Sequence, residues 1–291
     1  MSRLTDEQGA ALIFDLGAHA GEDTSYYLSR GFYVVGVDAD RNLVDGLSQG
    51  FAADIESGRL QLVHAAVVGH GDGEIDFYVS QYKIWNSLLA KISTREQYTA
   101  ERVRVPTTDL PSLIARHGVP HYCKIDLEGG DLAAVESLQR AEGIPQFVSA
   151  ESECIGQDER VDEGNALAVL GALCTVGYVG FKLVEQRSLV VLEPDRSFFP
   201  RADRYVSSAD RRRLPIVDEF LDPFVRNRRR LARRLRYAFP KGASGPFGDD
   251  LDGDWLDHET ARATLLFHRR EYFSTREAVS YGFWCDWHAK L

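Results

Sequence analysis

Short apolar runs alternate with amphipathic stretches over the first two thirds of the chain. The runs have the length of buried strands, and glycine or proline residues separate them from segments in which apolar residues recur at helical spacing. This alternation predicts an α/β domain with a doubly wound, largely parallel sheet. The predicted strands are residues 11–16, 32–37, 60–68, 121–125 and 145–150, with an added ribbon strand over 74–79 and a short peripheral strand over 103–107.

The pattern changes toward the end of the chain. Residues 178–184 and 189–192 have the spacing of a hairpin, so the sheet is expected to end in an antiparallel pair. Between Asp210 and Lys241, eleven basic residues stand against four acids, and apolar residues recur near helical spacing. We therefore predict a domain of residues 1–200 and a C-terminal helical extension of residues 201–291 that serves as a lid, a substrate-recognition element or a dimer arm.

Composition and charge narrow the class of protein. The 291 residues are 44% hydrophobic and 27% charged, as in globular proteins, and the net charge of −10 opposes binding to nucleic acid. No apolar run approaches the roughly 20 residues of a membrane span. The first eight residues hold two acids and no apolar core, unlike a secretory signal. We therefore expect a cytoplasmic protein without a membrane span or a nucleic-acid partner.

A glycine turn follows the first predicted strand. Asp15-Leu-Gly-Ala-His-Ala-Gly21 leads into a helix, which lets backbone amides approach a ligand at the carboxyl edge of the sheet. The second strand ends at Asp38, at about the separation of 20 residues expected for an acid that binds ribose hydroxyls. Glu22 and Asp23 open the helix and would repel a pyrophosphate. The charges therefore favour S-adenosylmethionine, which carries sulfonium and ammonium groups, over a nicotinamide dinucleotide.

Two other classes of protein stay open on these residues. A nicotinamide-dependent oxidoreductase also uses a glycine turn, but its motif has glycine where His19 stands, and we find no Tyr/Lys or Cys/His catalytic pair. A non-catalytic binder would hold an anionic partner on the basic segment 226–236. The same segment could instead be a solvated helix face paired with the acidic remainder of the chain.

Several blocks of the sequence resemble, in order, those of FkbM-type methyltransferases. They are residues 14–24, 34–40, 64–74, 86–89 and 108–113, and Lys124-Ile-Asp-Leu-Glu-Gly129. The resemblance covers about residues 13–153, and His19 stands where the family usually has asparagine. It implies a Rossmann-like, seven-stranded methyltransferase sheet, S-adenosylmethionine as cofactor, and a sugar, glycolipid or polyketide hydroxyl as acceptor. The candidate cofactor-binding residues are Asp15, Gly17, Ala18, His19, Gly21, Thr24, Asp38, Ala39 and Ala66.

Carboxylates that follow two strands are the catalytic candidates. An aliphatic hydroxyl needs a general base or a divalent metal before it can accept a methyl group, and such groups should lie at the carboxyl ends of strands. Asp126 and Glu128 follow one strand, and Glu151 follows the next. We predict that Asp126 faces the reacting hydroxyl, with Lys124 as a salt-bridge partner of Asp126 or Glu128. If the site holds a metal, Asp126 and Glu151 are its expected ligands and Mg²⁺ the expected ion.

Aromatic residues distinguish the C-terminal extension. Trp255, Phe283, Trp284 and Trp287 are interpreted as part of a lid or dimer arm over the acceptor pocket, because aromatic faces stack on sugars and macrocycles. The expected partner is therefore a small-molecule or glycan acceptor, and a homodimer is compatible with the aromatic tail.

Overall fold

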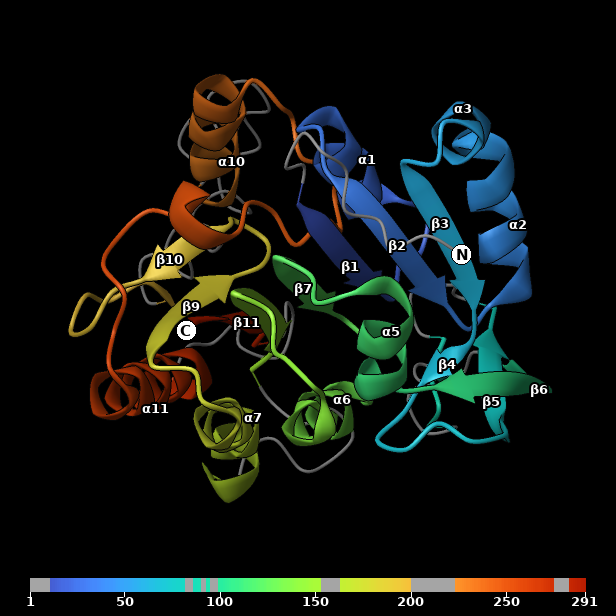
Figure 1. The fold of residues 1–291 in the computed structure, drawn as a ribbon. Helices are drawn as coiled ribbons and strands as arrows, with labels where there is room; N and C mark the ends of the chain where they lie inside the picture. The colour runs from blue at the N-terminus through green and yellow to red at the C-terminus, as the bar shows by residue number, and fades with distance from the viewer. Residues whose placement is uncertain are drawn as a thin grey trace.

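The central element of the fold is one sheet of eight strands. The structure is a computed structural model that describes residues 11–81, 86–89, 93–94, 99–152, 163–199, 223–274 and 283–291. The strand order is β10-β9-β11-β8-β7-β1-β2-β3 (Figure 1). The strands are β1 (Leu12–Leu16), β2 (Tyr33–Asp38), β3 (Leu60–His64), β7 (Tyr122–Ile125), β8 (Phe147–Glu151), β9 (Gly180–Glu185), β10 (Val190–Leu192) and β11 (Cys285–Lys290).

The middle of the sheet is parallel, as the apolar runs predict. Strand β1 pairs in parallel with β2 and β7, and these pair in parallel with β3 and β8. All five residues of β1 are buried, because helices cover both faces of the sheet. The predicted α/β class is confirmed.

Helices form two layers around the sheet (Figure 1). Tyr27 of α1 and Leu231 of α10 belong to the apolar cluster on one face, and Leu113 of α5, Val135 of α6 and Leu265 of α11 belong to the cluster on the other. The helices are α1 (Glu22–Ser29), α2 (Arg41–Gly50), α3 (Ala52–Glu56), α5 (Leu110–His117), α6 (Asp131–Ser137), α7 (Glu163–Val176), α10 (Pro223–Leu235) and α11 (His258–Ser274), with 3₁₀ turns at Leu138–Arg140 and Gly248–Asp250. Within the described residues, none of these helices is long and apolar enough to cross a bilayer.

The hairpin of β9 and β10 is confirmed, with Leu183 opposite Leu192. The aromatic tail differs from expectation. Cys285–Lys290 forms β11, which lies between β8 and β9 and is antiparallel to both. Trp287 is fully buried in this strand, so its prediction as a lid residue is wrong. The central sheet therefore draws a strand from beyond the predicted boundary at residue 200, and β10 brings its strand number to eight instead of the expected seven.

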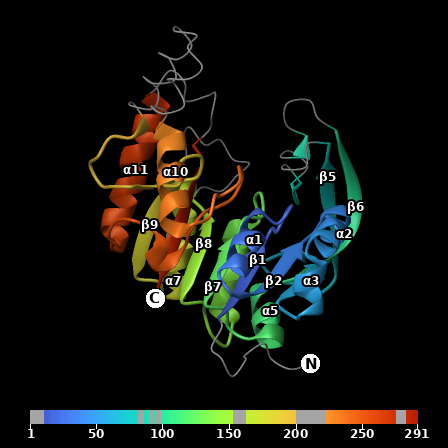
Figure 2. The same ribbon diagram turned by 90° about the horizontal axis from the view of Figure 1, so that it is seen from above.

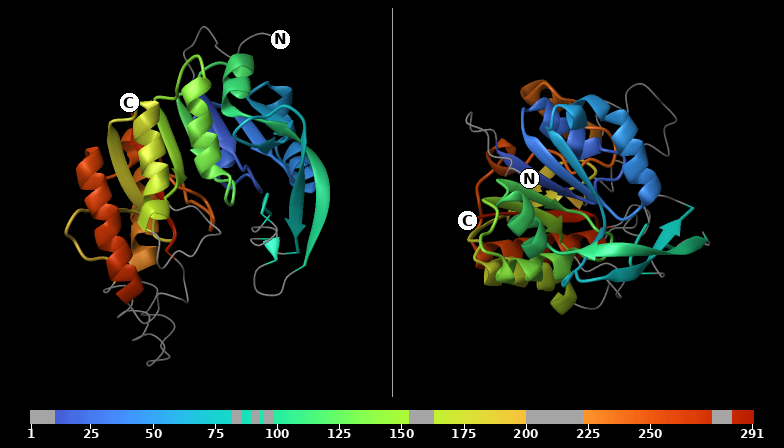
Figure 3. Two further views of the ribbon diagram at one scale, coloured as in Figure 1. Left: turned by 90° about the horizontal axis from the view of Figure 1, so that it is seen from below. Right: turned by 45° about the vertical axis from the view of Figure 1, so that its right-hand side comes forward.

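A second, three-stranded sheet projects from the central one (Figures 2 and 3). It contains β4 (Ala66–Val67), β5 (Glu74–Ser80) and β6 (Ala100–Thr108), with β6 in the middle. The predicted short strand over 103–107 is thus part of a strand of nine residues. Because β4 follows β3 directly, this small sheet is attached to the edge of the central sheet where β2 and β3 end.

Candidate active site

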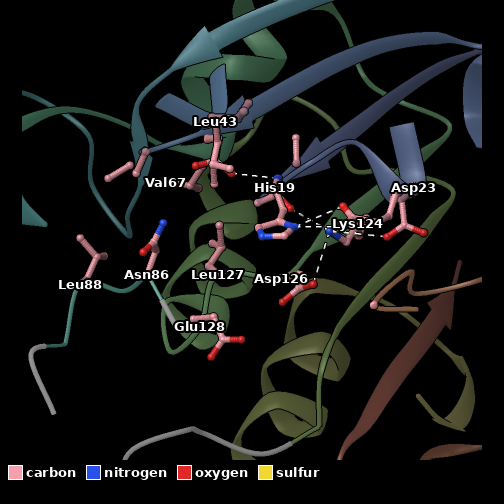
Figure 4. A pocket seen from close by; sticks show the side chains of 18 of the residues that line it. His19, Asp23, Leu43, Val67, Asn86, Leu88, Lys124, Asp126, Leu127 and Glu128 are labelled. Atoms are coloured by element: carbon pink, nitrogen blue, oxygen red, sulfur yellow. Dashed lines mark hydrogen bonds and ion pairs between the residues drawn. The ribbon is translucent and has the colours of Figure 1, made fainter. Parts of the chain in front are cut away.

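A cavity of about 350 Å³ opens where β1, β2 and β7 end at their carboxyl termini. This volume lies within the usual range of small-molecule sites. Figure 4 shows side chains from these strand ends converging on it. The candidate cofactor-binding and catalytic residues on its wall are Gly17, Ala18, His19, Asp38, Ala39, Ala66, Asp126 and Glu128.

The glycine turn is clamped between two strands. The backbone amides of Gly17 and Ala18 both donate to the carbonyl of Val37, at 2.9 and 3.1 Å. Gly17 has a φ of +77°, and a Cβ atom there would lie 1.8 Å from the carbonyl oxygen of Asp126. Only glycine fits this position, because any side chain would displace the backbone that carries Asp126.

Asp38 is held by backbone donors. Its two carboxylate oxygens accept hydrogen bonds from the amides of His19 at 2.9 Å and Asp40 at 2.8 Å. Burial raises the pKa of Asp38 to about 6. Each oxygen has a second lone pair, so the carboxylate can accept further hydrogen bonds from a ligand in the cavity.

His19 shapes the turn and faces a carboxylate. Its backbone is left-handed, with a φ of 47°, which is uncommon for a residue other than glycine. The ring Nδ1 lies 3.1 Å from Oε1 of Glu22, and this hydrogen bond raises the pKa of His19 above its ordinary value. Burial alone would raise the pKa of Glu22. The hydrogen bond with His19 and hydrogen bonds from backbone amides outweigh burial, so the pKa of Glu22 is lowered.

Three other predicted cofactor residues lie behind the wall. Thr24 donates its hydroxyl hydrogen to a carboxylate oxygen of Asp15 at 2.5 Å, and both side chains are buried. Gly21 has a φ of +87°, and a Cβ there would lie 2.6 Å from the ring of Phe51. Asp15, Gly21 and Thr24 do not line the cavity. Their contacts stabilise the glycine turn.

Lys124 is a buried cation that contributes to the cavity wall (Figure 4). Its Nζ donates to the carbonyl of Gly17 at 2.9 Å and lies 3.3, 3.7 and 3.4 Å from carboxylate oxygens of Asp15, Asp23 and Asp126. Burial alone would lower the pKa of Lys124, but Asp15, Asp126 and Asp23 raise it well above its ordinary value. The predicted pairing with Asp126 is confirmed, and two further partners tie β1 and α1 to β7.

The two carboxylates after β7 reach the cavity, whereas the third catalytic candidate does not. The side chain of Asp126 is 38% exposed on the cavity wall. Glu128 also lines the cavity, and its backbone is left-handed with a φ of 48°. Glu151 is absent from the wall and pairs in register with Asp286 of β11. Burial and the charge of Asp131 raise the pKa of Glu151 well above its ordinary value, which favours the protonated form.

The structure gives no support to the metal site that the sequence left open. Among the described parts of the chain, no group of three or more His, Cys, Asp or Glu side chains is placed to hold a metal ion. Of the two residues expected to bind a metal, Asp126 lines the cavity and Glu151 does not. Mg²⁺ therefore has no support at this site.

Sequence reasoning missed several wall residues. Asn86 donates its side-chain amide to Asp40 at 2.9 Å and accepts from the amide of Ser80 at 2.8 Å, which fixes it beside the end of β2. Residues 86–89 belong to the blocks that resemble the family, but the sequence alone assigns no function to Asn86. Other wall residues without a sequence-based role include Leu43, Phe77, Leu88, Lys241 and Gly242, and the sequence indicated only the charge of Glu22 and Asp23. Trp284, which the sequence predicts as part of a lid or dimer arm, also lines the cavity.

Ser87 braces the left-handed backbone of Glu128. Its buried hydroxyl donates to the Glu128 carbonyl at 2.7 Å and accepts from the amide of Leu89 at 3.0 Å. We expect Ser87→Ala to lower the free energy of unfolding by about 1–3 kcal/mol, because two hydrogen bonds of about 0.5–1.5 kcal/mol each are lost. Urea unfolding measures this loss. The exposed Ser48→Ala on α2 is the matched control, and an equally small loss in both variants would contradict the bracing role.

Arginine side chains of α10 contact the protein itself. Arg228 donates to backbone carbonyls, including that of Pro240 at 2.6 Å. Arg230 pairs with Asp252, and Arg234 has a nitrogen 3.6 Å from the same carboxylate. These contacts agree with the interpretation of a helix face paired with acidic residues, and they leave those three arginines engaged within the chain.

The fold and the site together define the class of protein. The strand order with the antiparallel β11 beside β8, the glycine turn after β1 and the carboxylate at the end of β2 are those of a Rossmann-like, S-adenosylmethionine-dependent methyltransferase. Residues 15–152 match the family model described as the methyltransferase FkbM domain. The match decides against the nicotinamide-dependent oxidoreductase that the glycine turn had left open.

The solved structures described below are distant from this chain in sequence. No curated protein matches the sequence. Among solved structures, an O-methyltransferase from Bacillus cereus in complex with SAH is 13% identical, with a TM-score of 0.34 over 61% of this chain and 68% of that one. A methyltransferase from Geobacter sulfurreducens in complex with S-adenosyl-L-homocysteine is 12% identical, with a TM-score of 0.35, and the alignment covers 97% of this chain and 83% of that one. Likenesses at this level carry no conclusion about the acceptor.

Proposed function

We propose that this protein is an O-methyltransferase that transfers a methyl group from S-adenosylmethionine to a hydroxyl of a sugar, glycolipid or polyketide-type acceptor. The observation that supports this most directly is the position of Asp126. Its carboxylate lies on the wall of the same cavity as the glycine turn and Asp38, and Lys124 forms an ion pair with it. A hydroxyl needs a base to become an acceptor, and this position of the carboxylate supports Asp126 as that base.

The residues of the β1–β2–β3 side of the cavity suit the cofactor. The carboxylate of Asp38 has lone pairs left for the ribose hydroxyls, and Leu43 and Ala66 offer apolar surface to an adenine ring. Glu22 supplies negative charge on the wall, which complements an ammonium group. When bound, S-adenosylmethionine supplies an electrophilic methyl group on a sulfonium.

Asp126 then has a defined task in the transfer. It accepts the proton of the acceptor hydroxyl as the oxygen bonds to the methyl carbon and the carbon–sulfur bond breaks, which leaves S-adenosylhomocysteine. Lys124 fixes the direction of the carboxylate through the 3.4 Å ion pair, so the base is oriented before the acceptor arrives. Glu128 is a second proposed catalytic carboxylate on the wall, whereas Glu151 lies off the wall and is left out of this mechanism.

Binding of S-adenosylhomocysteine tests the cofactor assignment. We expect Asp38→Ala to weaken this binding about 10- to 100-fold, because hydrogen bonds to a charged group contribute about 1.5–3 kcal/mol. Calorimetry measures the dissociation constant, and Asp45→Ala, which removes an exposed carboxylate on α2, serves as the control. Equal affinity in Asp38→Ala and the unaltered protein, or binding of NAD⁺ in place of S-adenosylhomocysteine, would refute the assignment.

The same binding should depend on pH. Because burial raises the pKa of Asp38 to about 6, the carboxylate is ionised at pH 7 and protonated at pH 5. Affinity for S-adenosylhomocysteine is expected to fall about tenfold for each pH unit below 6. The raised pKa means that the folded state binds this proton more tightly than the unfolded state, so protonation of Asp38 does not itself destabilise the fold. Calorimetry from pH 5 to pH 8, with Asp38→Ala expected to lose the dependence, measures the effect.

A further inference from the structure

The cavity has a second side that the cofactor residues do not occupy. Asp38 is the last residue of β2, Ala66 lies two residues after β3, and Asp126 follows β7. Trp284, immediately before β11, also lines the cavity, and β11 lies beyond β7 and β8 in the sheet. The base therefore stands between a cofactor side and a side formed by residues outside the 15–152 segment that matches the family.

Trp284 presents an aromatic surface on this second side. It is 37% exposed, and it is the only exposed tryptophan or phenylalanine among the residues whose burial the structure describes. Its backbone is fixed, because its carbonyl accepts from the amide of Gln186 at 3.0 Å and the next carbonyl, of Cys285, accepts from Ser152 at 2.8 Å. An exposed indole on a rigid backbone in a cavity is a surface on which a flat or ring-shaped ligand can stack.

A loop from the C-terminal region brings a cation to the same cavity. Lys241 and Gly242 line it, and the following residues are anchored to the helix of the cofactor side. The amide of Ser244 donates to both carboxylate oxygens of Asp23 at 3.0 Å, and the ring of Phe247 stacks on Tyr122 with centroids 4.0 Å apart. These anchors hold the backbone next to Lys241 in place.

The charges on the wall make Lys241 distinctive. Lys124, the other lysine of the cavity, is buried and engaged by three carboxylates. Lys241 is exposed and has no ion pair with any described residue, although Glu22, Asp126 and Glu128 share the cavity with it. An exposed ammonium group without an ion pair among the described residues can bind an anion on a ligand.

We propose that Trp284 and Lys241 form the acceptor subsite, and that this subsite takes a sugar ring that carries a negative charge, as a carboxylate or a phosphate. Trp284 stacks on the ring, Lys241 pairs with the anion, and a hydroxyl of the ring reaches Asp126. This inference rests on the proposed methyltransferase function, and it narrows the acceptor from any hydroxyl compound to an anionic sugar.

The test compares matched sugars on the protein saturated with S-adenosylhomocysteine. Glucuronic acid, glucose 6-phosphate and glucose are titrated by saturation-transfer NMR, and their turnover with S-adenosylmethionine is followed by release of S-adenosylhomocysteine. We expect at least one anionic sugar to bind about tenfold more tightly than glucose. Lys241→Ala should abolish this preference, Lys241→Arg should keep it, and Trp284→Ala should weaken both charged and neutral sugars. Arg233→Ala, which removes an exposed cation of α10 away from the cavity, is the control and should change nothing.

Separate outcomes overturn the subsite and the function. Normal binding of S-adenosylhomocysteine with no binding of any sugar, or with equal binding of charged and neutral sugars, would overturn the subsite and leave the methyltransferase intact. A loss of S-adenosylhomocysteine affinity in Lys241→Ala would assign this lysine to the cofactor instead, and so also overturn the subsite. No binding of S-adenosylhomocysteine to the unaltered protein would refute the proposed function itself, and the subsite with it.

Discussion

Replacing Asp126 with asparagine should lower kcat by about 100- to 10,000-fold, which is the usual contribution of a general base. The amide is the same size as the carboxylate but cannot accept the hydroxyl proton. The affinity for S-adenosylhomocysteine should change little, because the Asp126 side chain lies on the wall and the clamp of the glycine turn uses backbone atoms. The loss is therefore expected in kcat and not in cofactor binding.

Turnover and calorimetry on the same preparation distinguish this result from a folding defect. Glu136→Gln, at an exposed position on α6, is the control and should retain full activity. If Asp126→Asn kept near-normal turnover, the base would have to be another group on the wall, and Glu128 would be the next residue to replace.

Lys124→Met should lower the free energy of unfolding by about 3–5 kcal/mol, the usual cost of removing one partner from a buried charge cluster. Asp15 is fully buried and Asp23 is 3% exposed, so both carboxylates would lose their cation without gaining water. The glycine turn would also lose the hydrogen bond from Nζ to the Gly17 carbonyl. Among single substitutions near the site, we expect this one to destabilise the fold most.

Urea unfolding at two pH values checks the cause. Burial raises the pKa of Asp23 to about 6, so this carboxylate is largely neutral at pH 5. The destabilisation by Lys124→Met should accordingly be smaller at pH 5 than at pH 7, and the double variant with Asp15→Asn should recover part of it. A loss below about 1 kcal/mol at both pH values would show that the cluster is not the stabilising element we infer.

The parallel half of the sheet could be predicted because its signals are local. Each apolar run is bounded by glycine or a polar residue. Gly17 and Asp126 follow directly after strands, and Asp38 is the last residue of one. Parallel strands bring such ends to one edge, so the sequence order was enough to predict that these residues share a cavity.

The rest of the site depends on contacts between distant segments. Nothing near Trp287 in the sequence shows that its strand inserts between β8 and β9, and an aromatic run was therefore interpreted as a surface lid. Asp23 was recognised only as a charge at a helix start, whereas it also pairs with Lys124 and anchors Ser244, which is 221 positions away. Glu151 was expected on the wall, but its cross-strand partner Asp286 could not be foreseen.

The position of β11 has a consequence for synthesis of the chain on the ribosome. The last residues of β8 and β9 are made 134 and 100 residues before Cys285, and the facing edges of these strands stay unpaired until β11 emerges. Open strand edges of this kind are sites of wrong pairing and aggregation in nascent proteins. Trp284 immediately precedes this strand and lines the cavity, so the event that closes the sheet also completes the cavity wall. A nascent chain therefore gains a finished fold and a finished cavity in one late step.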